Sequence, residues 1–320
     1  MLRRLVIPAL WLLMPGVGAQ SVDLLADTAF QRGLQVKDRA GRLTEIRWDK
    51  QAAPPVWHTA QHHSKSSFAD PAYQQLTARG FHFKDPWQLL RIHPDDVAAD
   101  FVCGINGSAE FGGQWRAKGD PWPHLYLEQK ISAPGGHLGQ NAPSLAALAR
   151  LDFAIALKLL HDQRPESSQR NIHTHAAQFL FFLTVQNLNR QSKGYGDYYW
   201  FGLNLYDDRK PLTTLYAAQD KGSAKKKGTD KFIYSPGLDA FTKQIVGKGD
   251  WVPVSGDLLP HILTGLRESW QRGYLADSHE LADYKLGGAV LGWEVTGLND
   301  VAIAGKGLRA EAILKPAGRP

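Results

Sequence analysis

Two glutamates, Glu128 and Glu294, lie beside aromatic residues in the strand-like segments WPHLYLEQ and LGWEV. Paired carboxylates can hydrolyse a glycosidic bond, as acid and nucleophile about 5 Å apart or as acid and base at a wider separation. An exposed Glu on a strand is most often simply solvated, and chain order does not establish whether two such residues face each other. Glu128 and Glu294 are therefore the catalytic candidates if the chain is a hydrolase.

Residues Tyr195–Arg209 (YGDYYWFGLNLYDDR) hold the densest group of candidate ligand-binding side chains. The alternation indicates a strand with one face on a core, which leaves Trp200, Asn204 and Tyr206 on the other face. A flat aromatic ring beside hydrogen-bonding groups suits a sugar, which has an apolar face and a rim of hydroxyls. The alternative is that these aromatic rings only pack. The ligand-binding candidates across the whole chain are Trp115, Trp122, His124, Tyr126, Trp200, Asn204, Tyr206, Asp207 and Arg209.

A different chemistry would use His124, Tyr126, Tyr206 and Arg209 to remove a proton beside a uronate and stabilise the developing charge, as in a polysaccharide lyase. The lysine-rich segment KGSAKKKGTDK, residues 221–231, could attract an anionic polysaccharide, although such a run is usually a solvated loop.

Metal sites and cofactors have little support in the sequence. His58 and His62 have i, i+4 spacing but no evident third ligand, and His173 and His175 would also need another. We expect no cofactor; a structural calcium ion at Asp207-Asp208 is an alternative to a salt bridge with Arg209. No serine-hydrolase, zinc-protease, phosphate-binding or dinucleotide motif is present.

The elements that would position these residues are mostly short strands joined by turns. Residues 145–160 alternate like a strand despite their Ala and Leu content, and AAQFLFFLTVQ (176–186) predicts a central strand buried on both faces. Residues 71–79 predict a short helix. One long helix is expected from Leu259 to Trp270, with Asp257 as its cap and Gly273 as its stop.

This pattern predicts an all-β fold, a two-sheet antiparallel β-sandwich of the jelly-roll type with one α-helix in the C-terminal region. We expect residues 20–320 to form one sandwich domain. The alternative is two β domains that divide near residues 134–143.

The two ends of the chain carry a resemblance. LLADTAFQRGLQV near the start, the strands with an aromatic-rich face, and the closing GLNDVAIAGKGLRAEA resemble galactose-binding-like jelly-roll carbohydrate-binding modules. The resemblance implies a β-sandwich that contacts glycans through aromatic residues, without indicating which ones. The sequence is about twice the usual length of such a module, and we expect no attached catalytic domain, which would leave room for catalysis within the sandwich.

The N-terminus predicts export. Arg3 and Arg4 precede an apolar run and a small-residue site ending at Ala19, which together predict a signal peptide over residues 1–19 and a periplasmic or extracellular protein. No later stretch is long and apolar enough to predict a membrane span. The single cysteine, Cys103, lies in an apolar context and predicts an inert core thiol.

The formal charge of +6 becomes +4 without Arg3 and Arg4, and no nucleic-acid-binding motif accompanies it. The sequence therefore favours an exported carbohydrate-binding β-sandwich. The alternatives are a polysaccharide-degrading enzyme, as a hydrolase or a lyase, and a structural envelope protein.

Overall fold

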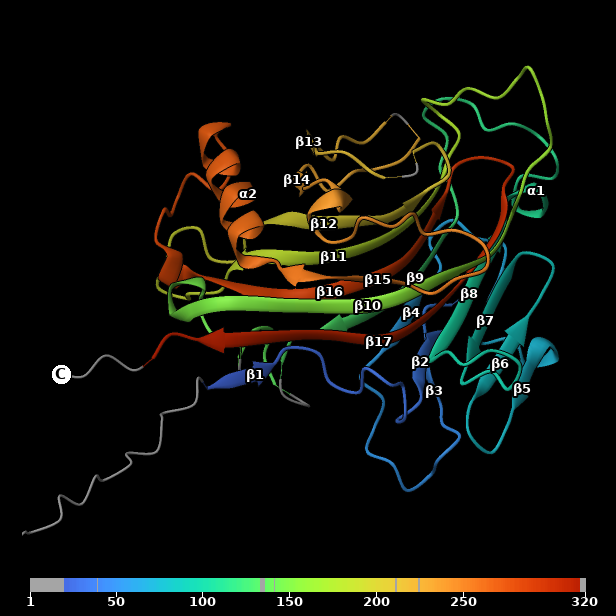
Figure 1. Ribbon diagram of the computed structural model, residues 1–320, viewed down its shortest axis with the longest axis horizontal. Coiled ribbons are helices and arrows are strands. Elements are labelled where there is room, and N and C mark those ends of the chain that lie inside the picture. Colours follow the sequence, from blue (N-terminus) through green and yellow to red (C-terminus); the bar gives the residue numbers. More distant parts are fainter. Residues whose placement is uncertain are drawn as a thin grey trace, which may run out of the picture.

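The two-sheet sandwich predicted from the sequence is present. The computed structural model describes residues 20–38, 40–132, 136–140, 142–210, 212–223 and 225–316. The expected signal peptide and part of the connection at residues 134–143 lie outside these residues. Figure 1 shows the long strands running across the molecule, with α1 (Gly107–Glu110) and α2 (Leu259–Gln271) at opposite ends.

The first sheet, sheet A, has eight strands among the described residues. Their order is β15 (Val252–Asp257), β10 (Leu148–Gln163), β17 (Asp300–Leu314), β8 (Phe101–Asn106), β7 (Gln88–Ile92), β6 (Phe81–Lys84) and β5 (Gln74–Leu76), and β1 (Ser21–Asp23) pairs with β17. Every pair is antiparallel. The first and last described strands therefore lie side by side.

The second sheet, sheet B, has nine strands among the described residues. Their order is β13 (Tyr216–Gln219), β14 (Phe232–Ser235), β12 (Tyr198–Asp207), β11 (Ala177–Asn187), β16 (Tyr284–Val295), β9 (His124–Lys130), β4 (His58–Ala60), β2 (Leu34–Lys37) and β3 (Leu43–Ile46). Its pairs are antiparallel except β12–β14 and β2–β4.

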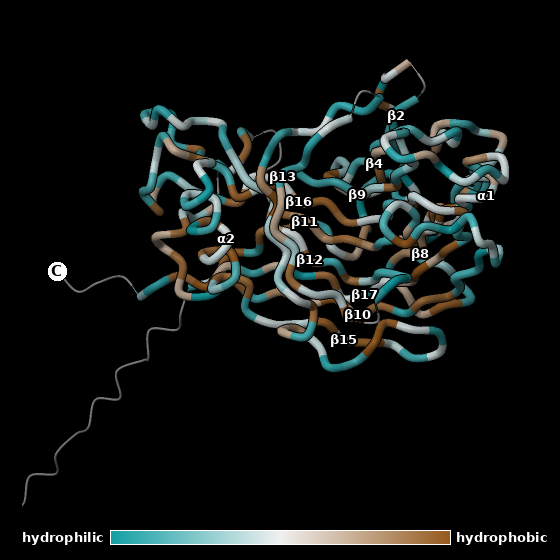
Figure 2. Tube along the Cα trace, turned by 90° about the horizontal axis from the view of Figure 1, so that it is seen from above, coloured by the Kyte–Doolittle hydropathy of each residue, from teal (hydrophilic) through white to brown (hydrophobic). Residues whose placement is uncertain are grey.

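The inner faces of the two sheets share one hydrophobic core. The Phe153 and Phe181 rings, one from each sheet, are 4.7 Å apart, and Trp293 Nε1 donates a 3.0 Å hydrogen bond to the Cys103 carbonyl. Cys103 is buried, and burial raises the pKa of its thiol, as expected for an inert core residue. Figure 2 shows hydrophobic residues concentrated along the central strands and hydrophilic residues around the periphery. The outer face of sheet B is left available for a site.

Helix α2 forms where the sequence predicts it, but its N-cap residue is Leu258 and not Asp257. Asp257 Oδ1 accepts a 2.9 Å hydrogen bond from the Leu259 N–H, and Gly273 ends the helix with a φ of 82°. The helix packs closely on sheet B, because a Cβ at Gly265 would lie 2.9 Å from the Tyr199 and Tyr234 rings. Tyr199 Oη donates to the Ile262 carbonyl at 2.6 Å.

Two local predictions are wrong. The short helix predicted over residues 71–79 is only one 3-10 turn, Pro71–Tyr73, which is followed by β5. Similar 3-10 turns occur elsewhere in the chain, at Leu145–Ala147, Leu238–Ala240 and Leu281–Asp283. Strand β11 is fully buried on its inner face but not on its outer face, where Leu180 is buried and Gln178, Phe182 and Thr184 are half-buried. The apolar run reflects large side chains along a cleft, not a second packed layer. No helix among the described residues is long and apolar enough to cross a membrane.

Candidate functional site

Four strands of sheet B place polar side chains side by side on its outer face. The register sets His124 of β9 opposite Glu294 of β16, Glu294 opposite Gln178 of β11, and Gln178 opposite Asp207 of β12. Neighbouring strands lie about 4.8 Å apart. These residues therefore form one row across the sheet, although they come from four distant segments of the chain.

The next positions along the same strands add aromatic and small residues. Tyr126, opposite Gly292, stands beside Glu294, and Glu128 follows two residues later. Gly202 on β12 leaves room for a neighbouring ring, since a Cβ there would lie 2.4 Å from Phe182. Trp200 lies one step further, 5.8 Å from Phe182 between ring centroids.

These residues line a cleft with a volume of about 730 Å³. Of the sequence-predicted candidates, the cleft contains Trp122, His124, Tyr126, Glu128, Trp200, Asn204, Asp207, Arg209 and Glu294. Trp115 and Tyr206 do not line it. The structure thus brings together nine side chains that sequence patterns nominated separately.

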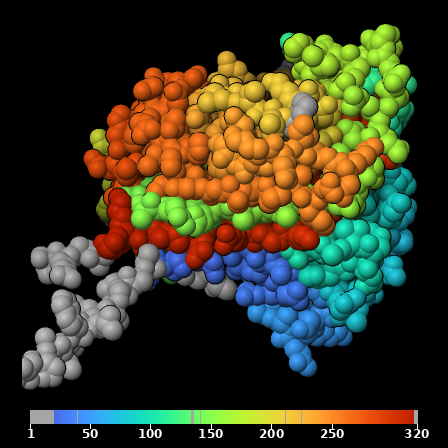
Figure 3. Space-filling view, in the orientation of Figure 1, coloured from blue at the N-terminus to red at the C-terminus, as the bar shows by residue number. Residues whose placement is uncertain are grey.

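Two loops close over one side of the cleft. The lysine-rich loop (residues 221–231) joins the Gly-rich loop (residues 111–122) where Ser223 Oγ donates to the Gly119 carbonyl at 2.7 Å and Lys225 pairs with Asp120 at 2.6 Å. In Figure 3 the gold residues near 210–235 form an upper surface of the molecule, next to yellow-green residues near 165. The lysine-rich loop is therefore part of the site rather than only a solvated loop.

Glu294 is held by two donors at the centre of the cleft. Tyr126 Oη donates to Oε1 at 2.5 Å and Trp122 Nε1 donates to Oε2 at 3.0 Å. His124 Nε2 lies 3.9 Å from Oε2. The two bonds orient the Glu294 carboxylate within the cleft, where it could act as a base, a nucleophile or a stabiliser of positive charge.

Burial sets the protonation of two neighbours. It lowers the pKa of His124 to about 4, although the Glu294 carboxylate favours the charged imidazole. Burial and the adjacent Glu294 carboxylate together raise the pKa of Tyr126 well above its usual range. At neutral pH the cleft therefore holds an uncharged imidazole and an uncharged phenol beside Glu294.

Trp122 contacts several protein groups. Lys226 Nζ lies 3.2 Å from the centre of the Trp122 ring, and the His124 ring is stacked against it with centroids 5.6 Å apart. Burial lowers the pKa of Lys226, while Glu294 and Asp220 act in the opposite direction. Lys226 therefore covers one face of the ring that we expected to be an open sugar platform.

Glu128 and Glu294 share the cleft but do not form a close pair. Glu128 lies opposite Val290, four residues before Glu294 on β16, which corresponds to about 13 Å along the strand. Glu128 also accepts a 2.8 Å hydrogen bond from His58 Nε2, on the side away from β16. Both features disfavour direct cooperation of the two glutamates at one glycosidic bond.

Asp207 and Arg209 form an ion pair in the cleft wall. Arg209 Nε and Nη2 donate to the two Asp207 oxygens at 2.8 and 2.6 Å, and Gln178 Nε2 adds a third bond at 2.9 Å. Burial alone would raise the pKa of Asp207, but the Arg209 bonds outweigh it and lower that pKa. Asp208 instead pairs with Arg170, and no metal-ligating cluster occurs among the described residues. The salt-bridge interpretation thus describes Asp207 better than a calcium site.

Tyr206 and Trp115 were predicted to bind a ligand but do not line the cleft. A register shift between Phe179 and Leu180 leaves Leu205 as an extra residue, so that Tyr206 turns inward, 5.8 Å from the Trp293 ring. Its hydroxyl donates to Asp162. Trp115 stacks on His175 at 4.7 Å, outside the cleft.

Three of the four histidines considered as metal ligands contact protein groups, and the fourth, His173, lines the cleft. His175 Nε2 lies 2.8 Å from the Arg116 carbonyl, and His58 contacts Glu128. His62 packs edge-on against the His124 ring.

Sequence reasoning missed several residues of the cleft. Arg116, Gln178, Phe182 and Lys226 all line it. Of these four, only Gln178 could be identified from the sequence, because it is a polar residue inside an apolar run. The sequence shows Lys226 only as part of a charged loop, and no sequence pattern predicts its contact with the Trp122 ring.

Comparisons with known proteins find structural similarity without sequence similarity. No protein-family model matches the chain, and no curated protein matches it. The chain is similar to a family 12 xyloglucanase from Bacillus licheniformis, with TM-score 0.40, 9% identity, and coverage of 79% of this chain and 99% of the other. It is also similar to an endoglucanase from Rhodothermus marinus (TM-score 0.36, 11% identity, coverage 74% and 92%). A third structure is the family 11 xylanase from Neocallimastix patriciarum (TM-score 0.37, 8% identity, coverage 80% and 99%).

Proposed function

We propose that this chain is an exported protein that binds an oligo- or polysaccharide in the cleft on the outer face of sheet B. The observation that carries the proposal is the composition of the cleft. Trp200 and Tyr126 supply apolar ring surface, while Asn204 and Glu294 supply hydrogen-bonding groups in the same volume of about 730 Å³. The cleft combines aromatic ring surface with many polar and charged side chains, a lining that suits a hydroxyl-rich ligand better than an apolar one. Export rests on the sequence of residues 1–19 alone.

An anionic polysaccharide is one candidate ligand. Arg116 and Lys226 are half-buried and form no ion pair with the described residues, because the Arg116 guanidinium donates to backbone carbonyls. Arg209, by contrast, is already neutralised by Asp207. Arg116 and Lys226, unlike Arg209, would therefore be available to a sugar carboxylate.

Hydrolysis of the bound glycan is the second candidate function, and the surroundings of Glu294 favour it. This carboxylate is oriented by Tyr126 and Trp122 inside the cleft. Asp220, on the loop that closes the cleft, also lines it and influences the pKa of both Tyr126 and Lys226. Glu294 and Asp220 lie on different elements and are a better acid–base candidate than Glu294 and Glu128.

The lyase alternative has weaker support. Its proposed charge stabiliser, Arg209, is bound to Asp207, and Tyr206 points into the core. Tyr126 donates a hydrogen bond to Glu294, and its pKa is raised, which disfavours the phenolate that a base would need.

The test is affinity electrophoresis of the mature protein through neutral and acidic polysaccharides, with parallel assays for reducing ends and for unsaturated uronate ends. Retardation by at least one polymer supports the binding proposal. New reducing ends alone support hydrolysis, and unsaturated ends support the lyase alternative. No retardation and no product with any polymer contradict the proposal and favour a structural role.

A further inference from the structure

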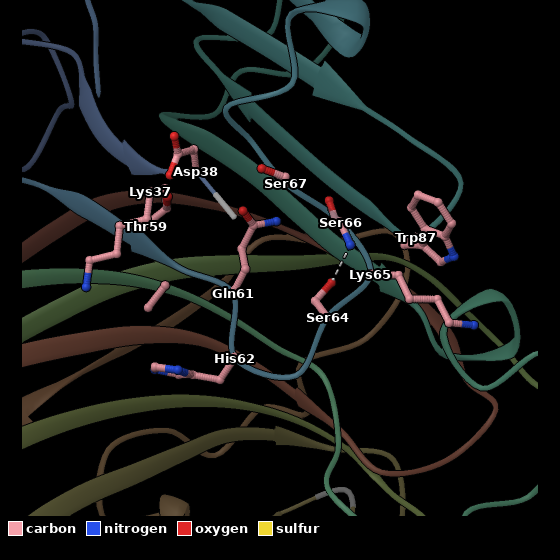
Figure 4. A pocket seen from close by; sticks show the side chains of 11 residues that line it. Lys37, Asp38, Thr59, Gln61, His62, Ser64, Lys65, Ser66, Ser67 and Trp87 are labelled. Carbon is pink, nitrogen blue, oxygen red and sulfur yellow. Dashed lines mark hydrogen bonds between the residues drawn. The ribbon is translucent and has the colours of Figure 1, made fainter. Parts of the chain in front are cut away.

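A second cavity lies beside the cleft, at the end of the strands β2 and β4. We call it the distal cavity; its volume is about 710 Å³. Figure 4 shows Trp87 on one side, Lys37 and Thr59 on the other, and Ser66 and Ser67 between them. None of the catalytic or ligand-binding candidates from the sequence belongs to it.

The distal cavity and the cleft are neighbours across sheet B. His62 lines both of them. Ala60 of the distal cavity lies opposite Tyr126 of the cleft, on the adjacent strands β4 and β9. Lys37, on β2, continues the same direction, since Gln35 two residues earlier lies opposite His58. A ligand crossing β12, β11, β16 and β9 would therefore reach β4 and β2 next.

The loop that forms the distal cavity is held firmly at both ends. Gln61 Nε2 donates to Gln88 Oε1 at 2.7 Å, and its Oε1 accepts the Phe68 N–H at 2.9 Å. Further along, the buried Glu110 carboxyl accepts hydrogen bonds from Ser64 Oγ and the Lys65 N–H. The cavity is therefore preformed, which lowers the ordering cost of binding.

Its lining suits a hydroxylated ring. Trp87 is half-buried and offers ring surface, and Ser67 is half-buried beside it. Thr59 and Ser66 also line the cavity, and neither side-chain hydroxyl has a hydrogen-bond partner among the described residues.

We propose that the distal cavity is an additional carbohydrate subsite, so that the ligand is an extended oligosaccharide running across the strands from the cleft, past His62, to Trp87. This inference rests on the proposed function, because it extends the same ligand beyond the cleft. It predicts that affinity rises again when the oligomer becomes long enough to leave the cleft.

The test uses calorimetric titration with two ladders of two to eight units, one of β-1,4-linked glucose and one of galacturonic acid. We expect wild-type affinity to increase in two stages with length. Trp87→Ala should weaken the longest oligomers about tenfold, which corresponds to about 1.4 kcal/mol, and leave the shortest unchanged. Ser67→Tyr, which fills the cavity, should give the same loss by another route. Trp251→Ala is the matched control, a half-buried tryptophan before β15 in sheet A.

Each outcome decides the inference. Two outcomes would overturn the distal subsite while the proposed function stands. One is that short oligomers bind and longer ones bind no more tightly. The other is that Trp87→Ala and Ser67→Tyr lose the same affinity for oligomers of every length. No binding of either ladder by the wild type overturns both. Selective loss for long oligomers in the two cavity variants, and not in Trp251→Ala, establishes the subsite.

Discussion

Tyr126 Oη donates a 2.5 Å hydrogen bond to Oε1 of Glu294 on the adjacent strand. This bond fixes the carboxylate in the middle of the cleft, and Trp122 Nε1 holds its other oxygen at 3.0 Å. The hydrolysis proposal depends on this arrangement, because it gives the cleft an oriented carboxylate among its aromatic residues.

Glu294→Gln keeps the size of the side chain and removes its charge. If the cleft hydrolyses glycans, product formation should fall by a factor of 100 or more, on the order expected for loss of an acid or base group. The unfolding free energy should fall by no more than about 1–3 kcal/mol, because the bonds from Tyr126 and Trp122 lose their charged acceptor. Reducing-end assays and urea unfolding measure the two effects. Glu280→Gln is the matched control at an exposed position, and equal activity in both variants would remove Glu294 from any catalytic role.

Tyr126→Phe removes one hydroxyl and leaves the ring. The variant should lose about 1–3 kcal/mol of unfolding free energy, since a half-buried carboxylate loses a charge-assisted donor. Urea unfolding at neutral pH measures the loss. Tyr73→Phe, at a tyrosine with 40% of its surface exposed, should be neutral; similar losses in both would show that the Tyr126–Glu294 bond contributes nothing specific.

Lowering the pH should destabilise the protein through His124. Burial lowers the pKa of this imidazole to about 4 in the folded state, against 6.5 for an unperturbed histidine. Between these values the unfolded chain binds more protons, so stability present above pH 6.5 is lost as the pH falls toward 4, by up to about 3 kcal/mol from this group. His124→Gln should flatten the curve of unfolding free energy against pH in that window, and an unchanged slope would contradict the assignment.

Trp200→Ala separates binding from packing. Trp200 is half-buried, 5.3 Å from Tyr198 between ring centroids, and lines the cleft. We expect about tenfold weaker glycan binding and a stability loss well below the 3–5 kcal/mol typical of truncating a fully buried ring such as Trp293. A large stability loss with unchanged binding would support the structural-protein alternative.

The strands that form the candidate site could be predicted from the sequence, but most contacts between their side chains could not. Trp200 and Asn204 were placed correctly because period-two alternation holds along most of β12. The prediction for Tyr206 is wrong because one extra residue at the β-bulge moves the Tyr206 side chain from the outer to the inner face of sheet B. No residue type at that position indicates a bulge.

Long-range register explains the other differences. Glu128 and Glu294 share a face, as alternation implies, but their offset depends on how β9 pairs with β16. Likewise, Lys226 reaches Trp122 only because two loops more than 100 residues apart meet at the Ser223–Gly119 hydrogen bond (|i−j| = 104). Local sequence patterns carry no information on either contact.

The central claim is that a glycan occupies the outer face of sheet B, and hydrogen exchange with mass spectrometry tests it most directly. The mature protein would be compared with and without the polysaccharide that retards it most, or with β-1,4-glucose and galacturonate octamers. The account predicts slower exchange in peptides covering residues 122–130, 198–207 and 221–231. Protection confined to other surfaces, or none at ligand concentrations that saturate binding, would contradict the account.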